Sequence, residues 1–191
     1  MGYLVGFLAR KFRGTSILKI FRSQFELLVC WPFNGIPSLP GFILRFIVCK
    51  IFAKRIHGFI WIQPRVEIVD LKNIEFGRNC GVNTGSYLNG LGGIQIGSNV
   101  LIGSNVTISS GRHPIDGIDG EIFENPSIPL PITIEDGVWI GAGAVIMPGI
   151  ILGRGCVIGA NAVVTKSTDP CSVYAGVPAR LIRKRDVRER S

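Results

Sequence analysis

Large apolar residues recur at every sixth position through two stretches of the chain. The hexads begin at residues 76, 82, 96, 102, 134, 140, 146, 152 and 158 and read FGRNCG, VNTGSY, IGSNVL, IGSNVT, IEDGVW, IGAGAV, IMPGII, LGRGCV and IGANAV. Ile62, Ile68 and Ile74 follow the same spacing in a less regular first coil. The first position is always Phe, Val, Ile or Leu, and the fifth is mostly small. Such a period predicts a repeat architecture with one continuous apolar core.

The fourth position of every hexad is Asn or Gly, the residues that most readily adopt a left-handed backbone conformation. Each hexad should therefore end in a sharp corner. Three sides would close a triangular coil of about 18 residues, and stacked coils would pair their strands in parallel. The pattern predicts an all-β fold, a left-handed parallel β-helix of hexapeptide repeats. An antiparallel meander would instead show apolar alternation between variably spaced turns.

The hexads stop between Ile108 and Ile134, where SSGRHPIDGIDGEIFENPSIPLP intervenes. A solenoid places such an insertion in a surface loop, which we assign to residues 109–131. His113 lies in this loop and is followed by Pro114, and the chain's other histidine is His57. A neutral imidazole is well matched to take a proton from a sugar hydroxyl near pH 7, so His113 is the candidate general base.

After the loop, the segments VWIGAGAVI, VIGANAVVTK and YAGVPARLIRKR follow one another. With the His113-Pro114 step, they make residues 60–185 resemble the hexapeptide-repeat acyltransferases, in the branch of the galactoside, maltose and nodulation-factor acetyltransferases. The basic, apolar N-terminal region is more similar to the surface-polysaccharide O-acetyltransferases of the colanic acid and O-antigen type. The resemblance implies acetyl-CoA as co-substrate, a sugar or glycan acceptor, no required metal, and a homotrimer with sites between neighbouring coils.

By the same resemblance, His113 deprotonates the acceptor, which attacks the thioester directly to give an oxyanion that backbone amides can stabilise. The family also uses a carboxylate to orient or charge-balance the histidine. Glu124 is our choice for that role, and the loop also offers Asp116, Asp119 and Glu121.

Asn83 and Asp116 are the candidate contacts to the acceptor. Asn83 aligns with an acceptor-contacting asparagine of the galactoside enzymes, although a plain turn residue is an equally good interpretation of its second position in the hexad. The chain has Asn89 and Gly90 where those enzymes carry an acceptor-binding aspartate. This departure argues against free galactosides and maltose as substrates.

The resemblance also implies a coenzyme A site on the C-terminal coils. Small residues would leave room for the extended pantetheine arm, an outward tryptophan would wall the thioester site, and basic or hydroxyl side chains would meet the adenosine phosphates. The candidate residues are Ala142 and Ala160, Trp139, and the phosphate-binding set Thr165, Lys166, Arg180 and Arg183.

The net charge of +8 in 191 residues is concentrated at the two ends of the chain. Residues 1–60 hold nine Lys/Arg against Glu26, and residues 180–191 hold six against two acids. The stretch between them holds six Lys/Arg and ten Asp/Glu. The basic charge therefore does not mark a nucleic-acid-binding face of the core, and no nucleic-acid partner is expected.

Three segments are expected: a helical, basic and apolar segment at 1–60, the β-helix at 61–178, and a basic tail at 179–191. Two short helices, at about 15–30 and 42–57, could lie in a membrane interface, with packing on the domain as the alternative. Three prolines interrupt the uncharged run 27–44 and argue against a membrane span. Five cysteines without a CxxC pair favour a reducing cytosol. A cytoplasmic enzyme with peripheral contact at the inner membrane face fits these features.

The leading function is O-acetylation of a sugar of a surface polysaccharide or its precursor. N-acetylation of a nucleotide-linked amino sugar would use the same base and co-substrate, and the sequence leaves it open. A non-catalytic structural β-helix is the alternative from another class, but it gives no reason for a His-Pro loop. A zinc hydratase on this fold needs three histidines, and the chain has two.

Overall fold

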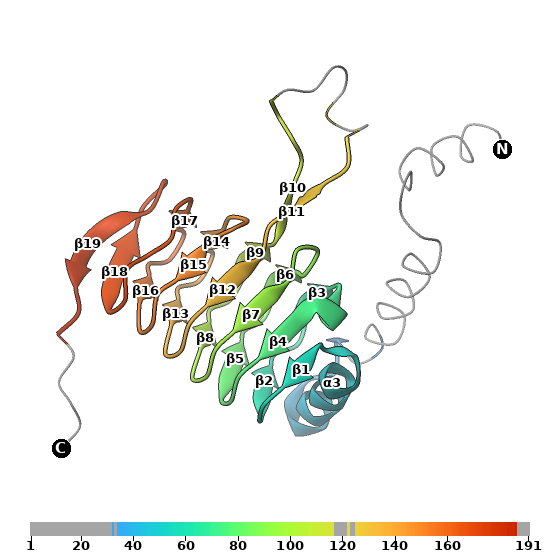
Figure 1. Cartoon of the computed structure of the whole chain (residues 1–191). Helices are drawn as coiled ribbons and strands as arrows, with labels where there is room; N and C mark the ends of the chain where they lie inside the picture. The colour runs from blue at the N-terminus through green and yellow to red at the C-terminus, as the bar shows by residue number, and fades with distance from the viewer. Residues whose placement is uncertain (1–31, 33, 117–121, 123–124, 187–191) are drawn as a thin grey trace.

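The computed structural model describes residues 32, 34–116, 122 and 125–186, and shows a three-sided parallel β-helix with a helix at its N-terminal end (Figure 1). Each side is one sheet, and adjacent strands in a sheet come from successive coils. Sheet A contains β1 (Arg55–Ile56), β4 (Ile74–Phe76), β7 (Ile94–Ile96), β12 (Ile132–Ile134) and β15 (Ile151–Leu152). Sheet B contains β2 (Ile60–Ile62), β5 (Cys80–Val82), β8 (Leu101–Ile102), β13 (Trp139–Ile140), β16 (Val157–Ile158), β18 (Ser172–Ala175) and β19 (Arg180–Lys184). Sheet C contains β3 (Glu67–Val69), β6 (Tyr87–Asn89), β9 (Thr107–Ser109), β14 (Val145–Ile146) and β17 (Val163–Val164).

The corners and the core follow the hexad pattern. All nine fourth-position Asn and Gly residues have positive φ, between 54° and 79°, so the left-handed corner prediction is confirmed. All nine first-position residues are buried, as are the fifth-position residues beside them. Side chains from the three sheets thus form one apolar column inside the coils. We name the turns between the sheets the AB, BC and CA corners, in chain order.

The first coils are longer than the predicted 18 residues. Glu75 pairs with Gln95 and Tyr87 with Thr107, an offset of 20, whereas Trp139 pairs with Val157, an offset of 18. The two extra residues lie at the CA corner. There the chain forms the 3-10 turn η1 (Leu71–Asn73) and, one coil later, a turn in which the Gly93 N–H donates to the Gly90 carbonyl.

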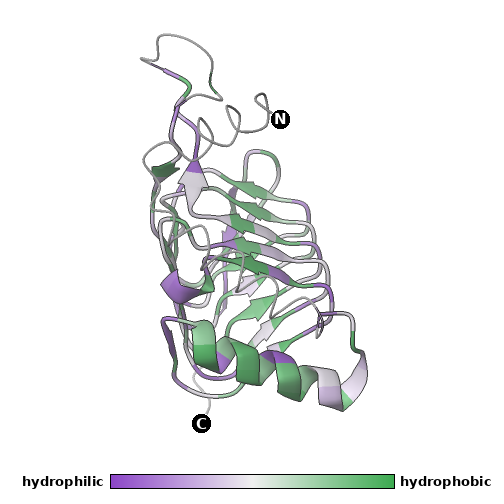
Figure 2. Ribbon diagram, turned by 90° about the vertical axis from the view of Figure 1, so that its right-hand side faces the viewer, coloured by the Kyte–Doolittle hydropathy of each residue, from purple (hydrophilic) through white to green (hydrophobic). Residues whose placement is uncertain are grey.

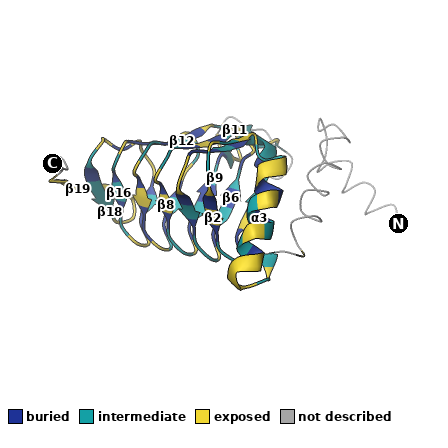
Figure 3. Cartoon of the chain, turned by 90° about the horizontal axis from the view of Figure 1, so that it is seen from below, coloured by how far each residue is buried: buried dark blue, intermediate teal, exposed yellow. Residues whose placement is uncertain are grey.

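Helix α3 (Ser38–Phe52) lies across the N-terminal end of the β-helix (Figure 3). The predicted helix at 42–57 is therefore wrong in both boundaries. Pro40 lies in the first turn, where its missing N–H costs no hydrogen bond, and the chain leaves the helix early because β1 joins sheet A. The other predicted helix, at about 15–30, lies outside the described residues. Among the helices that the structure describes, none has the length and apolar content to cross a membrane.

The inner side of α3 closes the core. Gly41, Arg45, Val48 and Cys49 are buried against the first coils. The Arg45 guanidinium donates from Nε to the Ile62 carbonyl at 2.9 Å and from Nη1 to the Ile36 carbonyl at 2.8 Å. Burial lowers the pKa of Arg45. The arginine thus ties the helix and the segment before it to strand β2.

The C-terminal end differs from the expected basic tail. Strand β19 pairs antiparallel with β18 and forms the edge of sheet B, so residues 180–184 belong to the folded solenoid. The pairing is irregular between Val173 and Tyr174, which lie opposite Arg183 and Leu181.

Candidate functional site

The long loop rises from the CA corner on a short antiparallel hairpin. Its base consists of β10 (Gly111–Arg112) and β11 (Ile128–Pro129), which project away from the three sheets (Figure 1). The buried Ser110 hydroxyl donates to the Asn89 carbonyl at 2.7 Å and accepts the Gly92 N–H at 2.9 Å. The Ser110 carbonyl accepts the Leu130 N–H at 2.8 Å. Both ends of the loop are therefore fixed to the preceding coil.

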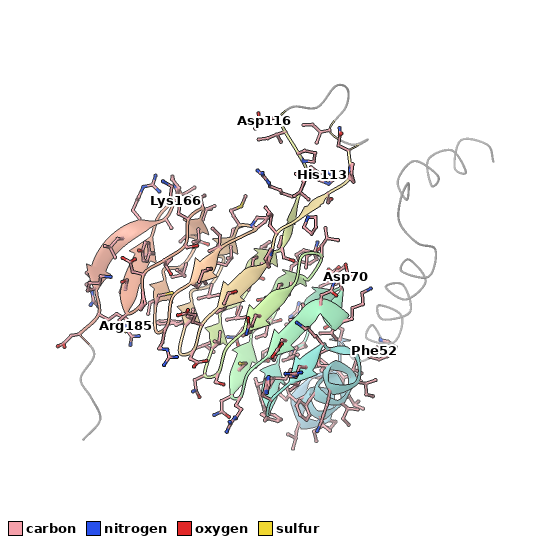
Figure 4. The ribbon with its side chains drawn as sticks, in the orientation of Figure 1. Phe52, Asp70, His113, Asp116, Lys166 and Arg185 are labelled. Atoms are coloured by element: carbon pink, nitrogen blue, oxygen red, sulfur yellow. The ribbon has the colours of Figure 1, made fainter. Side chains whose placement is uncertain are left out.

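His113 follows β10 and is exposed on this hairpin, as is Asp116 further out (Figure 4). His113 Nε2 lies 3.4 Å from the hydroxyl of Ser127, just before β11. Ser127 is thus a hydrogen-bonding group that the sequence reasoning missed. Glu124, our choice of supporting carboxylate, lies outside the described residues, as do Asp119 and Glu121.

Asn83 lies at the BC corner, on a different corner from the hairpin. Its side chain is half-buried, and its Nδ2 donates to the Ile102 carbonyl of the next coil at 2.9 Å. This bond holds adjacent coils together and does not bring Asn83 to His113 within one chain.

Small residues line the BC corner of the C-terminal coils. Ala142 and Ala160 are exposed there, one coil apart. A Cβ added to Gly141 would lie 2.6 Å from the Ala160 nitrogen, so only glycine allows the coils to stack this closely. The two alanines, each preceded by a glycine, form what we call the BC shelf. An extended chain with amide groups could lie on it.

The other candidate coenzyme residues come from several elements. Trp139 is 52% exposed on sheet B, between Leu101 and Val157. The Ala179 N–H donates to the Val163 carbonyl at 2.8 Å. This hydrogen bond holds the start of β19, where Arg180 lies, beside β17. Arg183 lies further along β19, and the exposed Thr165 and Lys166 follow β17 towards the CA corner.

A polar face on sheet C separates the hairpin from the BC shelf. Its outward side chains on β6 and β9 are Tyr87, Asn89, Thr107 and Ser109, which alternate with the buried Leu88 and Ile108. Burial is the main cause that raises the pKa of Tyr87. Of these residues, sequence reasoning named only Asn89, as a departure from an acceptor-binding aspartate, although the outward positions of the other three could have indicated them.

Within the part of the chain that the structure describes, no cluster of three His, Cys, Asp or Glu side chains is arranged to hold a metal ion. The arrangement instead combines an exposed imidazole on a fixed hairpin, the polar face of sheet C, and the BC shelf of small residues with arginines on the nearby strand β19. These features define a left-handed β-helix of the transferase kind.

Comparison with known proteins gives the family. Residues 131–166 match the model described as bacterial transferase hexapeptide (six repeats), and residues 93–111 match the hexapeptide repeat of succinyl-transferase. A solved galactoside acetyltransferase in complex with coenzyme A is 31% identical, with a TM-score of 0.81 over 91% of this chain and 85% of that chain. A maltose O-acetyltransferase of Clostridium difficile is 29% identical, with a TM-score of 0.80 and 90% of each chain covered. The chain belongs to the hexapeptide-repeat acyltransferase family, and the predicted fold is confirmed.

Two curated relatives come from Escherichia coli K12. The galactoside O-acetyltransferase is 40% identical over 133 residues, which cover 68% of this chain and 63% of the relative. WbbJ, which is assigned to lipopolysaccharide biosynthesis as an O-acetyl transferase, is 34% identical over 119 residues, which cover 58% of this chain and 60% of WbbJ. The chain thus spans less than two thirds of the length of either relative.

Proposed function

We propose that this protein transfers an acetyl group from acetyl-CoA to a hydroxyl of a sugar. The observation that carries the proposal is the exposed imidazole of His113 on a hairpin whose base is fixed by Ser110. His113 takes the proton of the acceptor hydroxyl while its oxygen attacks the thioester carbonyl. Collapse of the tetrahedral intermediate expels the coenzyme A thiolate, which takes up a proton. The Ser127 hydroxyl, 3.4 Å from Nε2, is placed to orient the ring.

Acetyl-CoA is assigned to the BC shelf. The pantetheine arm would lie over Ala142 and Ala160, with Trp139 beside the thioester. Arg180 and Arg183, together with Thr165 and Lys166, would bind the phosphates as charge-assisted and hydroxyl donors. Support comes from the exposure of all these side chains and from the coenzyme A complex of the similar galactoside acetyltransferase.

The complete site requires a second copy of the chain. His113 is at the CA corner and the shelf at the BC corner, with the sheet C face between them. A neighbouring copy that packs its hairpin against the shelf would join the two halves. A cyclic homotrimer satisfies this for all three sites at once, since each copy then gives one hairpin and one shelf.

The acceptor is assigned to the class of surface-polysaccharide sugars or their precursors. Its support is the similarity to WbbJ and the basic, apolar N-terminal segment. Asn83 and Asp116 remain the candidate acceptor contacts, and Glu124 the candidate partner of His113. The enzyme would work in the cytoplasm, at the inner face of the membrane where such precursors are assembled.

The test is coenzyme A release from acetyl-CoA with a panel of sugars, nucleotide-sugars and lipid-linked glycans, with mass spectrometry of the products. We expect acceptor-dependent release of an ester product, and a loss of roughly 100-fold or more in His113→Ala. His57→Ala is the matched control, because His57 lies at an AB corner and bonds to Glu75. An amide product would establish the N-acetyl alternative, and coenzyme A binding without turnover would refute catalysis on this panel.

A further inference from the structure

The outer side of α3 is apolar, unlike that of an ordinary surface helix. Leu39, Ile43, Ile47 and Ile51 are 62%, 47%, 46% and 67% exposed, and they recur every four residues. We name these four residues the cap face. A helix that is apolar on both sides needs cover on both sides, and the β-helix covers only the side of Arg45 and Val48. Figure 2 shows the apolar colour continuing around the helix.

The cap face is continuous with exposed aromatic surface on sheet B. Phe59 and Trp61 are 49% and 37% exposed. The Phe42 ring stacks on Trp61 with centroids 3.8 Å apart, and Phe46 lies 5.2 Å from Phe59. Tryptophan and phenylalanine beside an aliphatic helix face are typical of side chains at a lipid–water boundary. The patch exceeds the scattered single apolar residues normal on a protein surface.

The charges on α3 and on the residues that directly follow it are all positive, and a carboxylate beside them, that of Glu75 in β4, lies 3.8 Å from the Lys54 ammonium. From Ser38 to Arg55 the chain contains four Lys/Arg and no Asp or Glu. Lys50, Lys54 and Arg55 are exposed near the C-terminal end of α3, and the Lys50 ammonium lies 6.0 Å from the Phe46 ring. The sequence that precedes Pro32 adds five Lys/Arg against Glu26. This sequence has the same sign of charge as Lys50, Lys54 and Arg55. A partner with negative charge would therefore attract both.

We propose that the cap face is a docking surface for an anionic phospholipid membrane, on which α3 lies in the interface. Leu39, Ile43, Ile47 and Ile51 would enter the acyl boundary, while Lys50, Lys54 and Arg55 would meet the lipid phosphates. The proposal extends the assigned location of the enzyme and does not depend on the acetyl transfer. Because α3 crosses the end of the solenoid, the coil axis would point away from the membrane (Figure 3).

The test is co-sedimentation of the full-length protein with vesicles of phosphatidylcholine alone or of phosphatidylcholine mixed with the anionic lipid phosphatidylglycerol. We expect binding to the anionic vesicles that weakens as salt is raised. The double variant Ile43→Glu, Ile47→Glu should bind at least about tenfold more weakly, because charge then enters the apolar face. The matched control is Ile151→Glu, a 48% exposed isoleucine on β15 of sheet A, which should bind as wild type.

Two further measurements separate the outcomes. Circular dichroism melting should give the same midpoint for all three proteins, because the changed side chains are exposed. Sedimentation velocity without lipid should give the same assembly size. Equal vesicle binding by the double variant, or equal binding to both vesicle types, would overturn the proposal. A smaller assembly in the double variant would show instead that the cap face joins copies of the chain. Loss of lipid binding with retained acetyl transfer to a soluble acceptor leaves the catalytic proposal intact.

Discussion

The Ser110 hydroxyl accepts the Gly92 N–H at 2.9 Å, and this bond fixes the base of the hairpin that carries His113 to the preceding coil. A Cβ on Gly92 would lie 2.5 Å from the Leu130 nitrogen, where the hairpin returns. The glycine therefore lets both ends of the loop approach the corner below. The two extra residues of each of the first two coils also lie at the CA corner. The third coil extends its long loop from this same corner.

Ser110→Ala should destabilise the hairpin base and slow catalysis. The change removes the buried hydroxyl that accepts the Gly92 N–H and donates to the Asn89 carbonyl, at a cost of about 1–3 kcal/mol in the free energy of unfolding. Turnover should fall several-fold while the KM for acetyl-CoA changes much less, because Ser110 is buried at the base of the hairpin and is not one of the candidate coenzyme residues. Denaturant unfolding and steady-state kinetics measure the two effects. Ser98→Ala is the control, since its hydroxyl accepts the Arg78 N–H at 3.1 Å at an exposed AB corner, where water can replace it. Similar losses in both variants would refute the role of Ser110.

The core and corners could be predicted from sequence because each depends on one residue type at one position. Ile102 and Ile140 are buried by the period alone, and Asn105 or Gly143 adopts a positive φ whatever lies beyond its coil. The six-residue period does not specify the length of a corner, so the sequence predicts 18 residues for coils that have 20.

The ends of the chain and the assembly of the site could not be predicted in the same way. The sequence of strand β19 resembles a basic tail. All its residues are exposed, so no buried position marks it as a strand, and its antiparallel pairing with β18 departs from the parallel repeat. The Ser127 contact depends on the path of a long loop without a repeat. His113 and the alanines of the shelf are candidates that the sequence alone proposes, but their places on separate corners follow only from strand order.

Gly143→Ala should destabilise the β-helix through its corner. Gly143 has a φ of 71°, and an added Cβ would run into the side-chain amide of Asn161 in the next coil. Strain and crowding together should lower the free energy of unfolding by about 1–3 kcal/mol. In Gly143→Ala, Asn161→Gly the crowding is gone and the strain remains, so part of the loss should return. Chemical denaturation of the four proteins measures this cycle, and additive losses would contradict the contact.

Glu75 should make stability depend on acid pH. Its Oε1 is 2.9 Å from His57 Nε2, and this hydrogen bond, followed by the charges of Arg55 and Lys54, lowers the pKa of Glu75. The stabilisation is present above the unfolded pKa of about 4.3 and is lost as pH falls through the lower folded pKa.

Glu75→Gln should therefore be less stable than wild type by up to about 1 kcal/mol at pH 6, and the difference should shrink towards pH 3. Urea unfolding across this range measures it. Glu67→Gln, which removes an exposed carboxylate on β3, should show no such convergence. A constant difference for Glu75→Gln would mean that the ion pair is absent in solution.

The buried thiols should report on unfolding and not on catalysis. Burial raises the pKa of Cys80 and Cys156, whose side chains are 3% and 0% exposed. Cys171 is a free, half-buried cysteine in a turn before β18. Since the thiolate is the reactive form, iodoacetamide at pH 8 should modify Cys171 well before Cys80 and Cys156.

Peptide mapping by mass spectrometry assigns each modified position, and Cys80 and Cys156 should react only at the rate of unfolding. Because their folded pKa values lie above the unfolded value of about 8.5, the unfolded state releases protons first, and stability should fall as pH rises past that value. Cys80→Ala should flatten part of this decline between pH 8 and 10. Rapid native labelling of Cys80 or Cys156 would show that the coils open locally, which would contradict a continuous closed core.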